Sequence, residues 1–152
     1  MRALSIGLSV LLLCAPVAAD MPFPVRGELS GIAGVVDGDG LLIGGVEVRL
    51  QGIAAPEDNA HKVERGGPEA TRALRRLAEG RTASCYLDGS KTRGRPVGIC
   101  LVNGEDVGAV MVRKGFARDC PRYSKGRYAD AEKAAVRSGR NLATIYPLPR
   151  YC

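Results

Sequence analysis

The sequence contains very little of what a zinc centre requires. Of its 152 residues only one is a histidine, His61, and no two cysteines are separated by just two residues. Structural zinc sites normally combine closely spaced cysteines and histidines, so zinc is the less favoured use of the cysteines. The sequence also has no internal repeat and no low-complexity tract. Its length therefore predicts one folded domain.

Long apolar runs are equally scarce. The one candidate, residues 4–14, is too short to span a membrane comfortably. Arg2 precedes it and Ala-Pro-Val-Ala-Ala follows it, a pattern typical of a secretory signal peptide cut after Ala19. We expect residues 1–19 to be removed and the mature domain, residues 20–152, to be periplasmic or secreted. An N-terminal anchor that is not cleaved is the alternative.

Removing that segment leaves an even number of cysteines: Cys85, Cys100, Cys120 and Cys152. An even number in an exported chain predicts two disulfides. Cys85 and Cys100 fall on predicted strands joined by one loop, where they can face each other across an antiparallel pair. Cys152 ends a tail that has no apolar face of its own. A bond from Cys152 to Cys120 would hold that tail in place.

The charge of the chain is biased toward positive residues. Lysine and arginine number 22 against 16 acidic residues, a formal net charge of +6. Most of the basic residues are arginines, which favours a polyanionic partner such as nucleic acid. An arginine-rich surface that serves only solubility is the alternative. Arg72, Arg75 and Arg76, on one face of a predicted helix, are interpreted as solvated.

Hydrophobic periodicity and turn residues predict an α+β domain that is mainly β. Strands are expected over residues 28–36, 41–43, 46–50, 81–87 and 97–102. Helices are expected over residues 68–79, 106–114 and 128–138. Gly44-Gly45 suits a two-residue hairpin turn between the second and third strands. This order of elements suits a five-stranded barrel of the oligonucleotide-binding (OB) type with three helices.

Charged residues are concentrated at the ends of the predicted 41–50 hairpin. Asp37 and Asp39 lie just before its first strand, Arg49 lies near the end of its second strand, and Glu57 follows behind Pro56. Folding of the hairpin would bring these side chains toward one another. Carboxylates and an arginine fixed in this way could hold a hard cation and a phosphate. The alternative is an ordinary Asp/Gly turn beside a surface arginine.

A basic segment separates the last two predicted strands. Residues 88–96 read Asp-Gly-Ser-Lys-Thr-Arg-Gly-Arg-Pro and carry Lys91, Arg93 and Arg95. Glycines at this point would let the backbone approach a phosphate closely. Taken alone, the segment is interpreted as an ordinary basic hairpin loop, with a phosphate-binding loop as the alternative.

Taken in order, these motifs resemble those of the staphylococcal nuclease (thermonuclease) family. They are Val-Val-Asp-Gly-Asp, Arg-Leu-x-Gly-Ile-x-Ala-Pro-Glu, Gly-Pro-Glu-Ala and Arg-Gly-Arg. The first two together are quite specific, and the resemblance extends from about Glu28 to Leu142. The final Tyr-Pro-Leu-Pro-Arg-Tyr-Cys is similar to an extension found in an exported bacterial subgroup.

The resemblance implies hydrolysis of DNA and RNA phosphodiesters with calcium, on a five-stranded barrel with three helices. Asp39 resembles the aspartate that binds the metal. Arg49 and Arg95 resemble the arginines that hold the phosphate and stabilise its developing charge, a role suited to fixed guanidinium donors. Glu57 resembles the carboxylate that positions or deprotonates the attacking water.

Three positions depart from the family pattern. Ala54 stands where the family carries the second carboxylate on calcium, and Gly40 stands where a threonine is usual. Arg93 replaces an aromatic residue that helps to hold the nucleotide, although Tyr123 lies near the place of another family tyrosine. The residues expected to bind substrate are therefore Lys91, Arg93 and Tyr123.

The loss at position 54 weakens the expected calcium site. Calcium takes six to eight oxygen ligands, and Asp39 is the only family carboxylate left. The backbone carbonyl of Ala55, the side chains of Asp37 or Asp58, and water would have to supply the others.

Two functions follow from the sequence. The first is an exported, monomeric, calcium-dependent nuclease impaired by Ala54. The second is a catalytically inactive OB-fold module that binds nucleic acid or another anionic ligand. Retention of Glu57 favours the enzyme, because binding alone has no need of this carboxylate, whereas Ala54 favours the binding module.

Overall fold

The computed structural model describes residues 20–152, so the predicted signal peptide, residues 1–19, lies outside the described residues. The strands are β1 (Gly27–Asp37), β2 (Gly40–Ile43), β3 (Val46–Leu50), β4 (Ile53–Ala54), β5 (Asp58–Asn59), β6 (Lys62–Val63), β7 (Thr82–Thr92), β8 (Arg95–Val102), β9 (Glu105–Asp106) and β10 (Arg118–Asp119). The helices are α1 (Gly67–Ala78), α2 (Val107–Arg113), α3 (Pro121–Ser124), α4 (Ala129–Arg137) and the 3-10 helix η2 (Leu142–Thr144). Within residues 20–152 no helix is long and apolar enough to cross a membrane.

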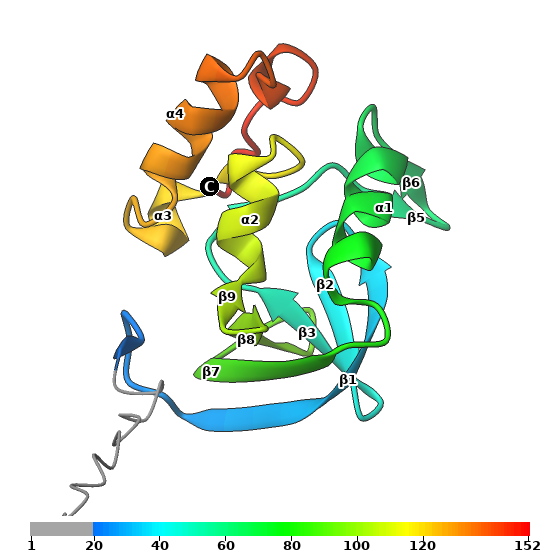
Figure 1. Cartoon of the computed structure of the whole chain (residues 1–152), viewed down its shortest axis with the longest axis vertical. Helices are drawn as coiled ribbons and strands as arrows, with labels where there is room; N and C mark the ends of the chain where they lie inside the picture. The colour runs from blue at the N-terminus through cyan, green and yellow to red at the C-terminus, as the bar shows by residue number, and fades with distance from the viewer. Residues whose placement is uncertain (1–19) are drawn as a thin grey trace, which may run out of the picture.

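Five strands close into a mixed barrel. Their order is β3-β2-β1-β7-β8, and a parallel pairing of β3 with β8 closes the circle while the other neighbours are antiparallel. The long strand β1 pairs with β7 through its first half and with β2 through its second half. Figure 1 shows α2, α3 and α4 gathered on one side of these strands. The predicted mainly β, OB-type fold is confirmed.

The hairpin of β2 and β3 follows from its sequence. Gly44 and Gly45 have positive φ angles of 57° and 83°, and they connect paired residues Ile43 and Val46. Such a turn matches the twist of the two strands and is nearly restricted to glycine, asparagine and aspartate. The apolar side chains of this hairpin then enter the barrel interior. They are Leu41, Ile43, Val48 and Leu50.

The three predicted helices are present, and a fourth was not predicted. In α2 the Asp106 side chain accepts hydrogen bonds from the backbone N–H groups of Gly108 and Ala109, which caps the helix as expected. The additional helix, α3, is a single turn in a segment that the sequence predicts to be irregular. It begins at Pro121, a residue suited to the first turn of a helix.

The basic segment between β7 and β8 is more regular than predicted. The strands extend through residues 88–96 to a two-residue turn at Arg93 and Gly94, whose φ angles are 50° and 81°. The pairing is interrupted between Leu87 and Lys91, where the register shifts. Pairing resumes between Lys91 and Pro96 and between Thr92 and Arg95, so the tip of the segment is a regular hairpin.

Two disulfides are present, in the pairing that the sequence predicts. Cys85 and Cys100 are register partners on β7 and β8 and are bonded within the core. Cys120, just before α3, is bonded to the terminal Cys152. The backbone N–H of Arg122 also donates to the Cys152 carbonyl at 3.0 Å. The end of the tail is thus held against the start of α3.

Candidate functional site

A cleft of about 570 Å³ is lined by the end of β1, by β3, by the hairpin of β7 and β8, by α3 and by the C-terminal tail. It gathers most of the side chains that the sequence singles out. The predicted residues that line it are Asp37, Asp39, Arg49, Glu57, Arg93, Arg95 and Tyr123.

An ion pair between Asp39 and Arg49 is largely buried in the cleft. The Nη2 atom of Arg49 lies 2.9 Å from Asp39 Oδ2, and the two side chains are only 13% and 12% exposed. Arg49 also donates to the carbonyls of Leu50 and Ile53, at 2.9 Å each. A guanidinium has five N–H donors, so these two hydrogen bonds do not exhaust the donors of Arg49.

The position of Asp39 depends on a tightly packed turn between β1 and β2. The Asp37 carboxylate accepts from the Asp39 backbone N–H at 3.3 Å. A Cβ atom at Gly38 would lie 2.7 Å from Ala70 Cβ and 2.8 Å from Ala55 Cβ. Only glycine therefore lets the turn pack between α1 and the segment after β4, which explains the Asp-Gly-Asp sequence.

Burial governs the protonation of Asp39. Burial is the largest cause and raises the pKa of Asp39 to about 6, and the negative charges of Asp37 and Glu57 act in the same direction. The guanidinium of Arg49 and the N–H of Ala55, which donates to Asp39 Oδ2 at 3.2 Å, oppose that rise. A positive charge beside Asp39 therefore stabilises the ionised form of this buried carboxylate.

Arg95 forms a second cationic position on the neighbouring strand β8. Its Nη1 atom donates to Glu47 Oε1 at 2.8 Å, and its Nε donates to the Thr92 carbonyl at 3.4 Å. Burial lowers the pKa of Arg95, but the hydrogen bond and charge of Glu47 outweigh it, and the pKa lies above its ordinary value. Arg95 is thus a fixed, permanently charged group in the cleft.

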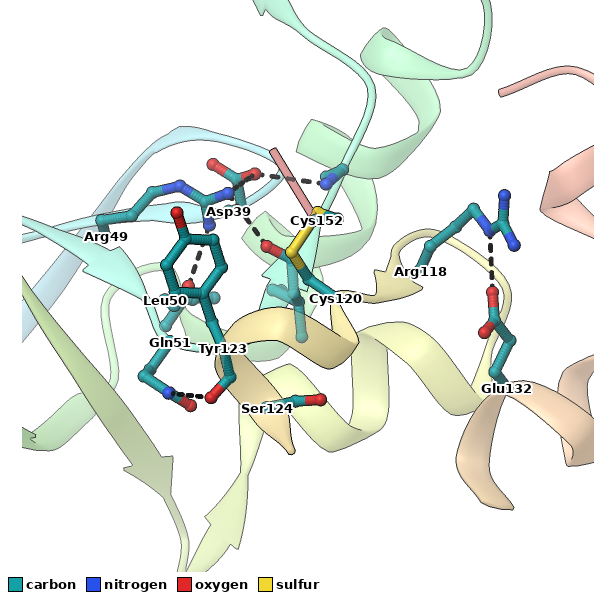
Figure 2. The surroundings of a disulfide bond; sticks show 12 residues. Asp39, Arg49, Leu50, Gln51, Arg118, Cys120, Tyr123, Ser124, Glu132 and Cys152 are labelled. Carbon is teal, nitrogen blue, oxygen red and sulfur yellow. Dashed lines mark hydrogen bonds and ion pairs between the residues drawn. A yellow bond between two sulfur atoms is a disulfide. The ribbon is translucent and has the colours of Figure 1, made fainter. Parts of the chain in front are cut away.

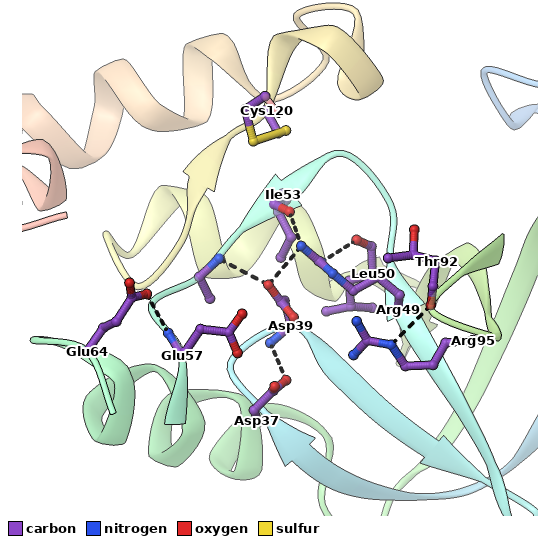
Figure 3. Close-up of polar contacts among 12 residues, drawn as sticks. Asp37, Asp39, Arg49, Leu50, Ile53, Glu57, Glu64, Thr92, Arg95 and Cys120 are labelled. Atoms are coloured by element: carbon purple, nitrogen blue, oxygen red, sulfur yellow. Dashed lines mark hydrogen bonds and ion pairs between the residues drawn. A yellow bond between two sulfur atoms is a disulfide. The ribbon is translucent and has the colours of Figure 1, made fainter. Parts of the chain in front are cut away.

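Glu57 is held by the small β5–β6 hairpin. Asn59 Nδ2 donates to Glu57 Oε2 at 2.7 Å, and the Glu57 backbone N–H donates to Glu64 Oε2 at 3.0 Å. Figure 3 shows the Glu57 carboxylate directed toward Asp39, with Arg49 beyond it. Within residues 20–152 the Glu57 carboxylate therefore has no arginine partner. Its hydrogen bond from Asn59 holds it in position.

Two tyrosines lie at the edge of the cleft near α3. Tyr123 belongs to α3, and its carbonyl accepts from the Gln51 side chain at 2.8 Å. Tyr151 comes from the C-terminal tail, next to the disulfide-bonded Cys152. Figure 2 shows the Cys120–Cys152 bond close to α3 and Tyr123.

Some predicted residues do not line the cleft. Lys91 is exposed on β7, and Asp58 begins β5, outside the lining. Ala55 reaches Asp39 through its N–H, so the predicted role of its carbonyl stays a prediction. Ala54 is fully buried, where β4 pairs with β10.

Sequence reasoning also missed residues that shape the site. Glu47 fixes Arg95, and Asn59 fixes Glu57. Tyr151 also lines the cleft. The alternation along β3 puts Glu47 on the same side as Arg49, so Glu47 could have been found from the strand pattern. Tyr151 gave no local signal, because its place depends on the disulfide at the end of the chain.

Comparison with known proteins agrees with this geometry. A family model described as "Staphylococcal nuclease homologue" matches residues 47–144. The chain belongs to this family. It is also 34% identical, over 125 residues, to a protein of Rhizobium meliloti (strain 1021) named "Succinoglycan biosynthesis protein ExoI". The match covers 77% of this chain and 65% of that protein, which is less than two thirds of its length.

Staphylococcal nuclease homologues are usually phosphodiesterases that require calcium, and the side chains here do not fit that ion well. Asp39 Oδ2 already forms an ion pair with Arg49 and accepts from the Ala55 N–H. Ala54 offers no side-chain oxygen. Among residues 20–152 no three acidic, histidine or cysteine side chains are grouped closely enough to hold a metal. A calcium ion needs more oxygens than this arrangement presents.

Proposed function

We propose that the mature chain is an exported nuclease that hydrolyses phosphodiester bonds of DNA or RNA as a monomer. The observation that carries this proposal is the convergence of Arg49, Arg95 and Glu57 on one cleft. The two arginines supply fixed N–H donors of the kind that phosphate oxygens prefer. Glu57 supplies a carboxylate that anion binding alone would not need, since negative charge repels a phosphate.

The side chains assign clear roles in such a hydrolysis. Arg49 and Arg95 hold the phosphate oxygens and stabilise the charge that accumulates on them in the transition state. Glu57 accepts a proton from the attacking water, whose oxygen forms the new bond to phosphorus. The phosphorus–oxygen bond to the leaving sugar then breaks, and the leaving oxygen takes a proton from solvent. Asp39 keeps Arg49 in position throughout.

We propose further that the calcium requirement of the family is weakened in this chain. Asp39 is its only retained family ligand, and Arg49 already neutralises it. Calcium affinity depends on the number of charged ligands and on site rigidity. High calcium concentrations should therefore be needed for any effect of the ion on activity.

Export is supported by the cysteines. Disulfides such as Cys85–Cys100 and Cys120–Cys152 persist in oxidising compartments. Together with the signal peptide expected over residues 1–19, they favour a periplasmic or secreted location.

A non-catalytic module that binds nucleic acid or another anion is the second candidate. The observation that favours it is the burial of Ala54 at the place of a metal-binding carboxylate. In such a module the arginines would still bind phosphate, but Glu57 would have no role.

Digestion of single-stranded DNA by residues 20–152 tests the proposal, with calcium, with manganese and with a chelator. The Glu57→Gln variant is the matched control, because it keeps the shape of the side chain and removes the base. The nuclease should lose hydrolysis in this variant and keep DNA binding. Binding without hydrolysis in the wild type would favour the module, and absence of both would reject nucleic acid as the ligand.

A further inference from the structure

The tyrosines of this chain divide sharply by exposure. Of five tyrosines, three are buried in the domain: Tyr86, Tyr128 and Tyr146. The other two, Tyr123 and Tyr151, are each 49% exposed. Both of these line the cleft. Every half-exposed tyrosine ring is thus found beside the cationic cleft.

Tyr151 is placed there by the covalent end of the chain. It directly precedes Cys152, whose disulfide partner Cys120 also lines the cleft. The Cys152 carbonyl accepts from the Arg122 N–H at 3.0 Å, and the Cys152 N–H donates to the Pro149 carbonyl at 2.9 Å. The disulfide and both backbone hydrogen bonds of Cys152 therefore hold the end of the tail, and this places the adjacent Tyr151 at the cleft.

A half-exposed ring in the same cleft as two arginines matches the chemistry of a nucleotide. Single-stranded nucleic acids are held by basic groups along the backbone and by aromatic side chains on which bases stack. In this cleft Arg49 and Arg95 provide the first component. Tyr123 has Arg122 at 5.8 Å from its ring centroid, so one of its faces already has a neighbour. Tyr151 supplies a ring from a different part of the chain.

We propose that Tyr151 is a base-stacking residue of a nucleotide subsite that the Cys120–Cys152 disulfide builds at the edge of the cleft. The inference rests on the proposed function, namely that the cleft binds nucleic acid. The occupant is the base of a nucleotide whose neighbouring phosphate lies on the cleft arginines. The subsite is selective for unpaired bases, because a base stacked in a duplex does not present its face.

Two labelled oligonucleotides of equal length separate stacking from phosphate binding. One is oligothymidylate, and the other has the same backbone without bases. Dissociation constants are measured by fluorescence anisotropy in a Glu57→Gln background, which prevents hydrolysis. Tyr151→Ala should weaken binding of oligothymidylate by about tenfold, as expected for the loss of one stacked base. It should leave binding of the abasic oligonucleotide unchanged.

Matched variants exclude a structural explanation. Tyr151→Phe retains the ring and should bind both oligonucleotides like the parent. Val136→Ala, which truncates an exposed apolar residue on α4, should also have no effect. Cys152→Ser releases the tail and should weaken oligothymidylate binding as Tyr151→Ala does, with no additional loss when the two changes are combined.

The failures of the two proposals are distinguishable. Equal weakening of both oligonucleotides by Tyr151→Ala, or no weakening of either, would overturn the stacking subsite without refuting the cleft as a phosphate-binding site. Tight abasic binding that requires Arg95 would then still support the cleft as a nucleic-acid site. If the parent protein binds neither oligonucleotide, the proposed function fails and the subsite fails with it.

Discussion

The arginines of the cleft and the arginines of helix α1 carry the same charge but are held in different ways. Arg49 is 13% exposed, forms an ion pair with a carboxylate and donates to two carbonyls. Arg95 is 21% exposed and is fixed by Glu47. On α1, Arg72 is 57% exposed and pairs only with Glu69 three residues earlier, while Arg75 and Arg76 are exposed.

The difference shows that arginines of equal charge can be held very differently: burial and partners fix those of the cleft, whereas those of α1 are solvated. An exposed pair on a helix contributes little and leaves the side chain mobile. A guanidinium already fixed by partners loses less freedom when a phosphate arrives, so more of the interaction energy remains for binding. Arg49 and Arg95 are thus already fixed in the absence of a ligand, whereas the α1 arginines are solvated.

Alanine substitutions should produce the largest effect and test this comparison directly. Arg95→Ala removes a charge-assisted donor directed at the phosphate, so we expect the hydrolysis rate to fall by at least about 10²-fold, as for the loss of an oxyanion donor. Arg49→Ala should lose as much. Arg75→Ala, which removes a solvated charge, should remain close to the wild type. Single-turnover digestion of single-stranded DNA measures all three.

Folding must be measured alongside the rates. Arg49→Ala leaves Asp39 buried without its cation, so this variant should also be destabilised, and its rate is normalised to the folded fraction. Arg95→Ala leaves only the less buried Glu47 and is the cleaner test. Equal losses for Arg75→Ala and Arg95→Ala would refute the assignment of the site.

The elements of this fold were predictable because their signals are local. The alternation in 41–50, the Gly44-Gly45 turn and the Asp106 cap each act within a few residues, and all occur as predicted. Helix α3 was missed because a single turn buries too little apolar surface to leave a periodic pattern. The extension of β7 and β8 was missed because pairing across the hairpin overrides the loop-like composition of residues 88–96.

The site was predictable only in part. The resemblance named Asp39, Arg49, Glu57 and Arg95, and the structure brings all four to one cleft. Tyr151 was not predicted, because its position depends on a contact between distant parts of the chain. It reaches the cleft beside a disulfide whose two cysteines are 32 residues apart. No local pattern encodes such a contact.

Ala54→Asp should have the next largest effect and would change what neutralises Asp39. Ala54 is fully buried, so a carboxylate there lacks solvation and destabilises the domain unless a cation joins it. We expect a lower melting temperature without calcium, and calcium affinity at least about tenfold above that of the wild type, since affinity follows ligand charge. Calorimetric titration and thermal unfolding with and without calcium measure this.

Ala54→Asn is the matched control for this change. It has nearly the same shape without the charge, so it should be destabilised in the absence of calcium and recover little when calcium is added. Gain of calcium binding together with faster DNA hydrolysis would sharpen the nuclease interpretation. Tighter calcium binding without hydrolysis would favour the binding module, and equal behaviour of the two variants would show that position 54 does not face Asp39.

Glu47→Gln should have the smallest effect and makes Arg95 more like an arginine of α1. The amide still accepts a hydrogen bond from Arg95, but the charge that anchors the guanidinium is lost. Partly exposed ion pairs contribute up to about 1 kcal/mol, so we expect roughly a two- to fivefold loss in DNA binding or turnover. Glu105→Gln, which removes the carboxylate from the exposed Arg113–Glu105 pair, should change neither. A gain of affinity in Glu47→Gln would instead mean that Glu47 competes with phosphate for Arg95, and that fixation by a carboxylate is a cost to binding rather than preparation for it.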